Sequence, residues 1–243
     1  MSIPRCHALL PCAGAGARAG GASPKQYRLI VGEPLACHTL RAFQAVARIG
    51  HILIVLAPED DHPWPQPPPR VELARIGGAS RAASVLNGLH HLLAHGAAPS
   101  DWVLVHDAAR CLITPALIDA LIDACWSDPV GGLLALPCPD TIKAEAQDSS
   151  GQPTGHVAAT LSRGDKWLAQ TPQMFRLGAL RAALQQQAAS GFAGITDEAS
   201  AIEHAGGQPL LVRGSAQNIK VTWPEDFALA EAVLQSRRAS TPA

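Results

Sequence analysis

The sequence lacks a strong net charge, paired cysteines and long apolar runs. The formal net charge of its 243 residues is −1 at pH 7, which argues against a protein that coats nucleic acid. Six cysteines are scattered along the chain without a C-x-x-C pair. We therefore expect reduced, mostly buried thiols rather than a disulfide framework or a zinc site.

No apolar run approaches the roughly 18 residues that a membrane-spanning helix needs. The amino-terminal sequence MSIPRCHALLPC also has too short an apolar region for a signal peptide. We therefore expect a cytoplasmic protein with neither a membrane nor a nucleic-acid partner. A hydrophobic content of 47% over this length is enough for one large domain with a sizeable core.

Apolar runs that suit strands alternate along the chain with helical patterns. The near-continuous run at 51–57, HILIVLA, is typical of a strand that is buried on both faces of a parallel sheet. The alternation therefore predicts an α/β protein with a mostly parallel sheet. The predicted strands cover residues 6–10, 51–57, 71–76, 102–105, 132–137, 210–213 and, at an edge, 218–222; the predicted helices cover 35–47, 81–94, 115–125, 177–190 and a last helix that ends near 235.

Two segments depart from this alternation. Residues 58–69 carry six prolines, so they can form neither a helix nor a central strand, and we interpret them as an extended surface connection. Residues 144–162 are polar and predict a long hairpin that projects from the sheet and needs a partner to lie on. We expect a single domain over 1–235, with this arm at about 141–165 and a flexible tail at 236–243.

The segment 11–27, PCAGAGARAGGASPKQY, combines four glycines with two cations directly after the first predicted strand. The glycines let the backbone turn sharply and present N–H groups to an anion. Arg18 and Lys25 add the positive charge that a nucleoside triphosphate needs. The segment is not a Walker loop, because Lys25 follows Pro24 instead of opening a helix, and Pro24 also interrupts its match to the dinucleotide pattern. A flexible surface loop is the alternative.

A second candidate phosphate contact lies at the start of the helix predicted for 81–94. Ser80 is the expected N-cap, which places Arg81 and Ser84 in the first helical turn. Backbone N–H groups point outward there and favour an anion. An ordinary cap with a solvated arginine explains the same pattern.

Charged residues also follow the strand predicted for 102–105. Ligands of open α/β sheets bind at the carboxyl ends of the strands, and Asp107 and Arg110 come directly after this one. The carboxylate can hold Mg²⁺ or a hydroxyl group, and the guanidinium can clamp a phosphate. We interpret His106 as structural. We also expect Thr196 to cap the next helix.

The motifs taken in order resemble one family. They are GAGAR and PKQY, GG-x-x-R-x-x-S, VHDAAR, DTIK, a polar arm with an arginine, TPQ, TDEAS and NIKVT. This set is similar to the 2-C-methyl-D-erythritol 4-phosphate cytidylyltransferase family of the non-mevalonate isoprenoid pathway, over residues from about 6 to 235. The resemblance implies a doubly wound, Rossmann-like nucleotidyltransferase, active as a homodimer with Mg²⁺ or another divalent cation. It would join CTP to 2-C-methyl-D-erythritol 4-phosphate and release pyrophosphate.

The resemblance also implies roles for individual residues. Arg18 and Lys25 would hold the triphosphate in the transition state, and Arg163 and Lys220 would position the acceptor phosphate. The partner's arm would supply Thr141 and Arg163 to each site. Mg²⁺ would be held mainly by the CTP phosphates, with Asp107 as the candidate protein ligand. The implied nucleotide-binding residues are Ala13, Gly14, Ala15, Gly16, Gly78, Arg81, Ser84 and Asp107, and the implied acceptor-binding residues are Asp107, Arg110, Thr141, Thr171 and Thr196.

Three positions depart from the family pattern, and two alternatives stay open. The family usually has an acidic residue at Ala79, a proline at Cys111 and a larger residue at Ala19. Ala79 would lie beside the cytosine base. The chain also resembles a cytidylyltransferase for ribitol 5-phosphate, which shares the glycine loop and VHDAAR. A regulatory protein that binds CTP without turnover is the other alternative. We expect no fused downstream synthase domain.

Overall fold

The protein is built around one seven-stranded sheet with the strand order β11-β7-β10-β6-β1-β4-β5. The computed structural model describes residues 4–14, 24–64 and 67–239. Neighbouring strands are parallel except at β10, which is antiparallel to both β6 and β7. The strands are β1 (Cys6–Pro11), β4 (Ile49–Val55), β5 (Val71–Ala74), β6 (Trp102–Val105), β7 (Gly131–Pro137), β10 (Trp167–Arg176) and β11 (Leu210–Arg213).

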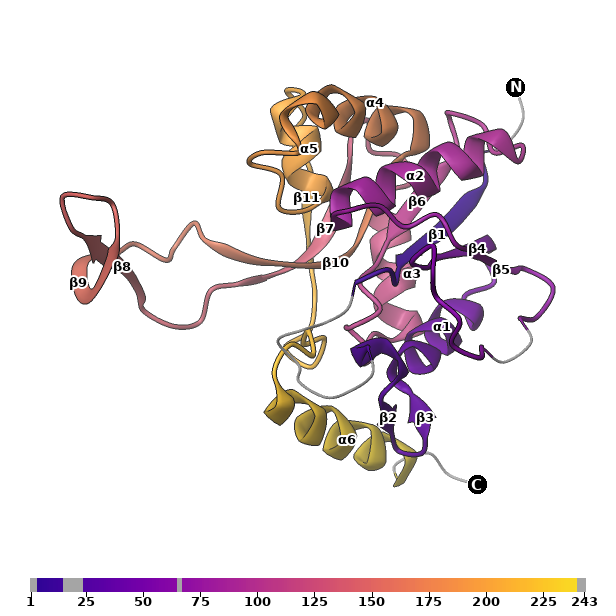
Figure 1. Cartoon of the computed structure of the whole chain (residues 1–243), viewed down its shortest axis with the longest axis horizontal. Coiled ribbons are helices and arrows are strands. Elements are labelled where there is room, and N and C mark those ends of the chain that lie inside the picture. The colour runs from indigo at the N-terminus through magenta and orange to yellow at the C-terminus, as the bar shows by residue number, and fades with distance from the viewer. Residues whose placement is uncertain (1–3, 15–23, 65–66, 240–243) are drawn as a thin grey trace.

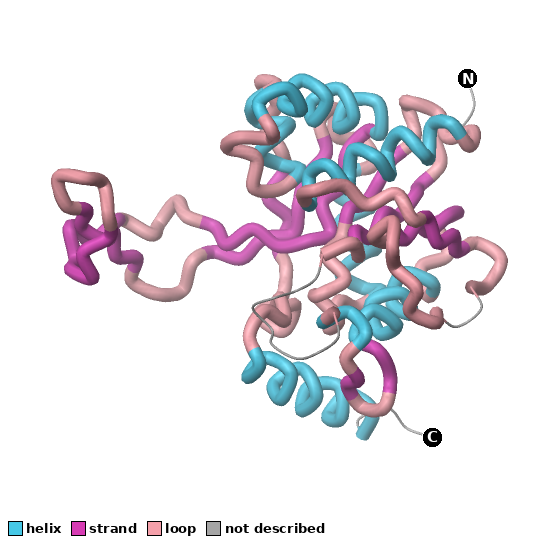
Figure 2. Tube along the Cα trace, in the orientation of Figure 1, coloured by secondary structure: helices cyan, strands magenta, loops and turns pink. Residues whose placement is uncertain are grey.

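Helices cover both faces of this sheet, so the prediction of a doubly wound, mostly parallel α/β fold is confirmed. In Figure 1, α2, α4 and α5 lie above the sheet and α1 and α6 lie below it, and Figure 2 shows the strands running between the two helical layers. The helices are α1 (Leu35–Gln44), α2 (Arg81–Ala94), α3 (Pro115–Cys125), α4 (Leu177–Gln187), α5 (Glu198–His204) and α6 (Pro224–Ala239), with short 3₁₀ turns η2 (Lys25–Tyr27) and η3 (Ala188–Ser190) and a small hairpin of β2 (Leu29–Ile30) and β3 (Glu33–Pro34).

The central strand β1 shows why the sequences of the buried strands are nearly continuous apolar runs. Ala8 and Leu10 belong to the core on the α1 and α3 side, whereas Leu9 belongs to the core on the α2 and α4 side. All three are at most 1% exposed. A strand with helices on both faces has no solvent side, so alternation disappears from its sequence.

The helices α2 and α3 have the bounds that the sequence predicted, and a capping side chain fixes where each one begins. The Ser80 hydroxyl oxygen accepts from the Ala83 N–H at the start of α2, and the Thr114 hydroxyl oxygen accepts from Leu117 at the start of α3. Pro115 fills the first position of α3, where no N–H is needed. Among the described residues, no helix combines the length and the apolar character needed to cross a membrane.

The predicted arm is a hairpin of β8 (Ile142–Gln147) and β9 (Pro153–Leu161), and it projects far from the sheet (Figure 1). Its turn forms around Asp148, whose carboxylate accepts from the backbone N–H groups of Ser150 and Gln152. Every residue of β9 is exposed. The hairpin therefore makes no core of its own, as its polar composition predicted.

Three local predictions are wrong. Residues 218–222 form no strand, because this segment crosses the loop after β6 and makes a single backbone bond there, from Val221 N–H to Ala109 O. Residues 236–239 are not a tail but the last turn of α6, where Arg237 donates to the carbonyl oxygen of Leu112. Residues 240–243 lie outside the described residues. Asp197, not Thr196, caps α5, because the Asp197 carboxylate accepts from the Ser200 N–H.

Candidate active site

A cavity of about 440 Å³ opens where the chain switches from one side of the sheet to the other. From β1 the chain passes through α1 to β4 on one side, and from β5 it crosses through α2 to β6 on the other side of β1. Ligands of open α/β sheets bind at such switch points. The cavity is lined by Pro11, Cys12, Ala13, Gly14, Lys25, Gln26, Leu35, Gly78, Ala79, Ser80, Arg81, Ser84, Asp107, Ala108, Ala109 and Lys220.

The glycine pair at 77–78 packs closely on both sides, with Gly77 against Ala13 after β1 and Gly78 against the first turn of α2. A Cβ added at Gly77 would lie 2.4 Å from the Ala13 Cβ, and one added at Gly78 would lie 2.6 Å from the Ala83 Cβ. The Ser84 hydroxyl group accepts from the Gly78 N–H at 3.0 Å and donates to Ser80 O at 2.9 Å. Ser84 is buried and shapes this loop, and it lines the cavity together with Ala13, Gly14 and Gly78.

Lys25 also lines the cavity and belongs to the 3₁₀ turn η2. Its ammonium group donates to Val221 O at 3.0 Å. The next residue, Gln26, is buried and donates from its amide to Cys12 O at 2.8 Å, which ties η2 to the end of β1. Ala15, Gly16 and Arg18 of the predicted phosphate loop lie outside the described residues, so their roles stay predictions.

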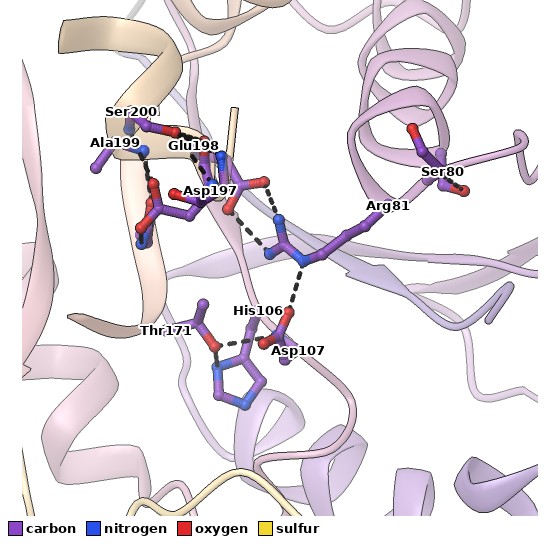
Figure 3. Close-up of polar contacts among 12 residues, drawn as sticks. Ser80, Arg81, His106, Asp107, Thr171, Asp197, Glu198, Ala199 and Ser200 are labelled. Carbon is purple, nitrogen blue, oxygen red and sulfur yellow. Dashed lines mark hydrogen bonds and ion pairs between the residues drawn. The ribbon is translucent and has the colours of Figure 1, made fainter. Parts of the chain in front are cut away.

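Four charged side chains form a continuous chain across the site, and Figure 3 shows three of them, Glu198, Arg81 and Asp107. Glu198 accepts from both terminal nitrogens of Arg81, at 2.6 and 3.0 Å. The Arg81 Nε donates to Asp107 Oδ1 at 2.8 Å, and Lys220 Nζ lies 2.7 Å from Asp107 Oδ2. These four residues, Glu198, Arg81, Asp107 and Lys220, form one ion-pair network. Its two negative and two positive charges balance.

Burial and neighbouring charge have opposite effects on the pKa values of Asp107 and Glu198. Burial alone would raise the pKa of Asp107, but Arg81 and Lys220 outweigh it and hold the pKa well below its usual range. Burial raises the pKa of Glu198, and Arg81 opposes that shift. The two short bonds to Arg81 are those of a carboxylate with a guanidinium.

Asp107 is also fixed through its backbone. Its N–H donates to the Thr171 hydroxyl oxygen at 3.0 Å, and this hydroxyl lies 3.1 Å from His106 Nδ1. Because His106 Nε2 faces the carbonyl oxygen of Arg110, Nε2 must carry the proton and Nδ1 accepts from Thr171. Burial lowers the pKa of His106 to about 3, which keeps this ring neutral. Thr171, predicted to bind the acceptor, is buried and positions Asp107 here.

The other predicted acceptor residues lie outside this cavity in the single chain. Arg110 donates to the carbonyl oxygens of Asn218 and Ala169, at 2.7 and 3.3 Å. Thr196 is exposed and lines a smaller cavity of about 140 Å³ beside Arg81. Thr141 and Arg163 are exposed on the arm side of the molecule, and Arg163 donates to Pro139 O.

Sequence reasoning missed three buried residues that build the site. Glu198 is 1% exposed and pairs with Arg81, although its place in the first turn of α5 suggested only a dipole contact. Gln173 binds the start of α5, and Gln26 binds the end of β1. The motifs TPQ, TDEAS and PKQY contain all three, but no local pattern indicates that these side chains are buried.

The described residues do not fit a protein-held metal centre. They contain no group of three or more histidine, cysteine or acidic side chains arranged to bind an ion. Asp107 is the one acidic side chain that lines the cavity in the described part of the chain, and cations already occupy both of its oxygens. A divalent cation would therefore need most of its ligands from a substrate.

A mostly parallel α/β sheet with a cationic cavity at its switch point defines a nucleotide-binding protein. A sequence model of the family described as IspD, 2-C-methyl-D-erythritol 4-phosphate cytidylyltransferase, matches residues 6–236. The chain therefore belongs to this family of nucleotidyltransferases.

Individual relatives agree with this assignment. The chain is 54% identical over 234 residues to the 2-C-methyl-D-erythritol 4-phosphate cytidylyltransferase of Laribacter hongkongensis, covering 95% of this chain and 96% of the relative. It is 60% identical over 238 residues to the bifunctional enzyme IspD/IspF of Albidiferax ferrireducens, covering 97% of this chain but only 54% of that relative. A crystal structure of 4-diphosphocytidyl-2C-methyl-D-erythritol synthase superposes with a TM-score of 0.79 at 35% identity, covering 96% of this chain and all of that one.

Proposed function

We propose that the protein transfers the cytidylyl group of CTP to 2-C-methyl-D-erythritol 4-phosphate, giving 4-diphosphocytidyl-2-C-methyl-D-erythritol and pyrophosphate. The observation that carries the proposal is the switch-point cavity, which is lined by Lys25, Arg81, Asp107 and Lys220, in a chain whose family match spans residues 6–236. The relatives named after this reaction supply the acceptor.

The reaction is a direct displacement at the α-phosphorus of CTP. A phosphate oxygen of the acceptor forms the new bond, the bond to the bridging oxygen breaks, and pyrophosphate leaves with the electron pair. Both reactants are anionic, so catalysis consists mainly of positioning and charge neutralisation. Cys12 lines the cavity, but burial raises the pKa of its thiol far above the usual range, so it is not a thiolate nucleophile at neutral pH.

The residues divide between the two substrates. Lys25 neutralises the triphosphate together with Arg18, and Lys220 meets the acceptor phosphate. Asp107, fixed by Arg81 and Thr171, orients Lys220 between them. A divalent cation held mainly by the CTP phosphates would supply further neutralisation of the phosphate charge.

We also propose a cytoplasmic homodimer in which each arm completes the partner's site. The arm and its base expose large apolar side chains, with Val157 62%, Leu168 50% and Leu161 44% exposed. A single chain leaves these groups in water, and a two-fold partner would cover them. Arg163 and Thr141 would then reach the acceptor in the neighbouring subunit.

Pyrophosphate release is the test of the activity. Purified protein with CTP and Mg²⁺ should release pyrophosphate with 2-C-methyl-D-erythritol 4-phosphate and at least 10-fold more slowly with ribitol 5-phosphate. Faster release with ribitol 5-phosphate would identify ribitol 5-phosphate as the acceptor instead. CTP binding without turnover on either acceptor would favour the regulatory alternative. With a chiral α-thio CTP, the proposed displacement should invert configuration at phosphorus, and net retention would contradict it.

A further inference from the structure

Glu198 is held in place more firmly than a helix-terminal carboxylate normally is. It is the first residue of α5, a position that usually faces solvent, yet its side chain is 1% exposed. Each of its two carboxylate oxygens accepts a hydrogen bond from one terminal nitrogen of Arg81. A fully buried carboxylate is costly unless its partner is fixed in good geometry.

The neighbouring strand β10 anchors the start of this helix. Gln173, 1% exposed on β10, accepts from the Ala199 N–H at 2.7 Å and donates to Asp197 Oδ2 at 2.8 Å. The other oxygen of Asp197 accepts from the Ser200 N–H at 2.9 Å, and Figure 3 shows both residues at the start of α5. The residues on both sides of Glu198 are therefore fixed to the sheet, and its carboxylate points toward Arg81.

We propose that Glu198 is a positioning residue of the transfer reaction, acting through Arg81 on Asp107 and hence on Lys220. This inference rests on the proposed function. Arg81 has a planar guanidinium group, so two bonds to Glu198 fix the direction in which its Nε donates. That direction places one oxygen of Asp107 on Arg81 and leaves the other to hold Lys220 at 2.7 Å.

The variant Glu198→Gln separates positioning from packing. Glutamine keeps the volume of the side chain, but its amide N–H₂ faces an N–H donor of Arg81, so the paired geometry is lost. Because displacements of about 1 Å near reacting groups cost up to about 100-fold in rate, we expect kcat to fall about 10- to 100-fold. The variant removes no cation from the site and shifts Lys220 only slightly, so both KM values should stay within about 3-fold. Glu203→Gln, the same change on an exposed site of α5, is the matched control and should leave kcat unchanged.

A double variant tests whether the effect passes through Arg81. Arg81→Lys cannot form the paired bonds and should lower kcat by a similar factor. Residues that act as one unit are not additive, so the double variant should be no more than about 3-fold slower than the slower single variant. Losses that multiply would overturn the proposal. Unchanged kcat in folded Glu198→Gln protein would also overturn it, as would a lower folded fraction that accounts for the whole loss of activity.

A substrate-free crystal structure of Glu198→Gln gives a readout that does not depend on the acceptor. The Arg81 Nε–Asp107 Oδ1 bond should be lost or displaced, and its retention at 2.8 Å would contradict the positioning role. If wild-type protein turns over neither polyol phosphate, the proposed function fails while this structure still decides the role of Glu198. If it prefers another acceptor, the kinetic cycle is measured with that acceptor.

Discussion

The Tyr27 hydroxyl donates to the Asp60 carboxylate at an O–O distance of 2.5 Å and accepts from the indole N–H of Trp64 at 3.0 Å. Tyr27 follows Lys25 by two residues, whereas Asp60 and Trp64 belong to the proline-rich connection. The ring of His62 stacks on the ring of Tyr27, with 3.9 Å between the ring centroids. The proline-rich segment thus packs against the turn that carries Lys25 and holds it in place through Tyr27.

Tyr27→Phe removes both of these hydrogen bonds and leaves Asp60 and Trp64 with an unsatisfied group each. We expect a loss of about 1–3 kcal/mol in the free energy of unfolding. That corresponds to a fall in Tm of roughly 2–4 °C per kcal/mol for a chain of this size. Chemical denaturation measures it, with Asp61→Asn, an exposed neighbour, as the control. Equal stabilities of Tyr27→Phe and wild type would show that the connection does not support this turn.

Lys25→Ala should lower kcat by about 100-fold, because the removed charge faces the triphosphate in a cavity where water is a poor substitute. Lys25→Arg should recover only part of the rate, since a planar fork does not replace a point charge. Steady-state pyrophosphate release measures both. Arg181→Ala on α4 removes a charge away from the cavity and should retain the wild-type rate. Near-normal turnover by Lys25→Ala would remove Lys25 from the proposed mechanism.

His106 should make the protein less stable as the pH falls. Its pKa is about 3 in the folded chain and near 6.5 when unfolded, so below pH 6.5 the unfolded state binds the extra proton. The free energy of unfolding should drop by about 2 kcal/mol between pH 6.5 and 5 from this group. Urea titrations at the two pH values measure it.

His106→Gln tests the assignment, because a glutamine amide can also accept from Thr171 and donate to the Arg110 carbonyl. The variant should show a flatter pH dependence, whatever its stability at pH 7. Burial also lowers the pKa of His7 and His51, but these groups contribute equally to both proteins. His90→Gln, at an exposed site, should keep the wild-type slope. An unchanged slope in His106→Gln would place the titrating group elsewhere.

Divalent cation should be required for turnover but should bind with the nucleotide. Both oxygens of Asp107 already meet cations, so the described residues offer no cage for a free ion. Chelation should stop pyrophosphate release, and Mg²⁺ should restore it. Calorimetry should detect saturable Mg²⁺ binding only when CTP is present. Tight binding of Mg²⁺ to the protein alone would reveal a metal site that this arrangement does not explain.

Mixing two inactive variants tests the arm exchange. Lys25→Ala and Arg163→Ala homodimers should each be nearly inactive. If Arg163 acts in the partner's site, a mixed dimer has one site with both defects and one with neither. Random reassortment should then recover about a quarter of the wild-type activity, because half of the dimers have one good site of two. No recovery, with mixed dimers shown to be present, would mean that Arg163 acts within its own subunit.

Local signals in the sequence were sufficient for most of the secondary structure. The bounds of β6, α2 and α3 match their predictions, since a cap or a buried apolar run marks each end within a few residues. The resemblance to the cytidylyltransferases also led to the family, because its motifs recur in order along the chain. The cavity brings together Ala13, Gly14, Lys25, Gly78, Arg81, Ser84, Asp107 and Lys220 of the predicted residues.

The tertiary structure alone decided which polar groups are buried and what they meet. A strand needs a neighbouring strand, and residues 218–222 instead lie across the loop after β6, where the Val221 N–H donates to Ala109 O, so the predicted edge strand does not form. The last turn of α6 persists because Arg237 reaches Leu112, far away in sequence. Glu198 looked like an ordinary helix-start acid until the fold placed it on Arg81. Propensity and capping depend on neighbours in sequence, whereas the pairing of a buried charge depends on what the whole fold brings beside it.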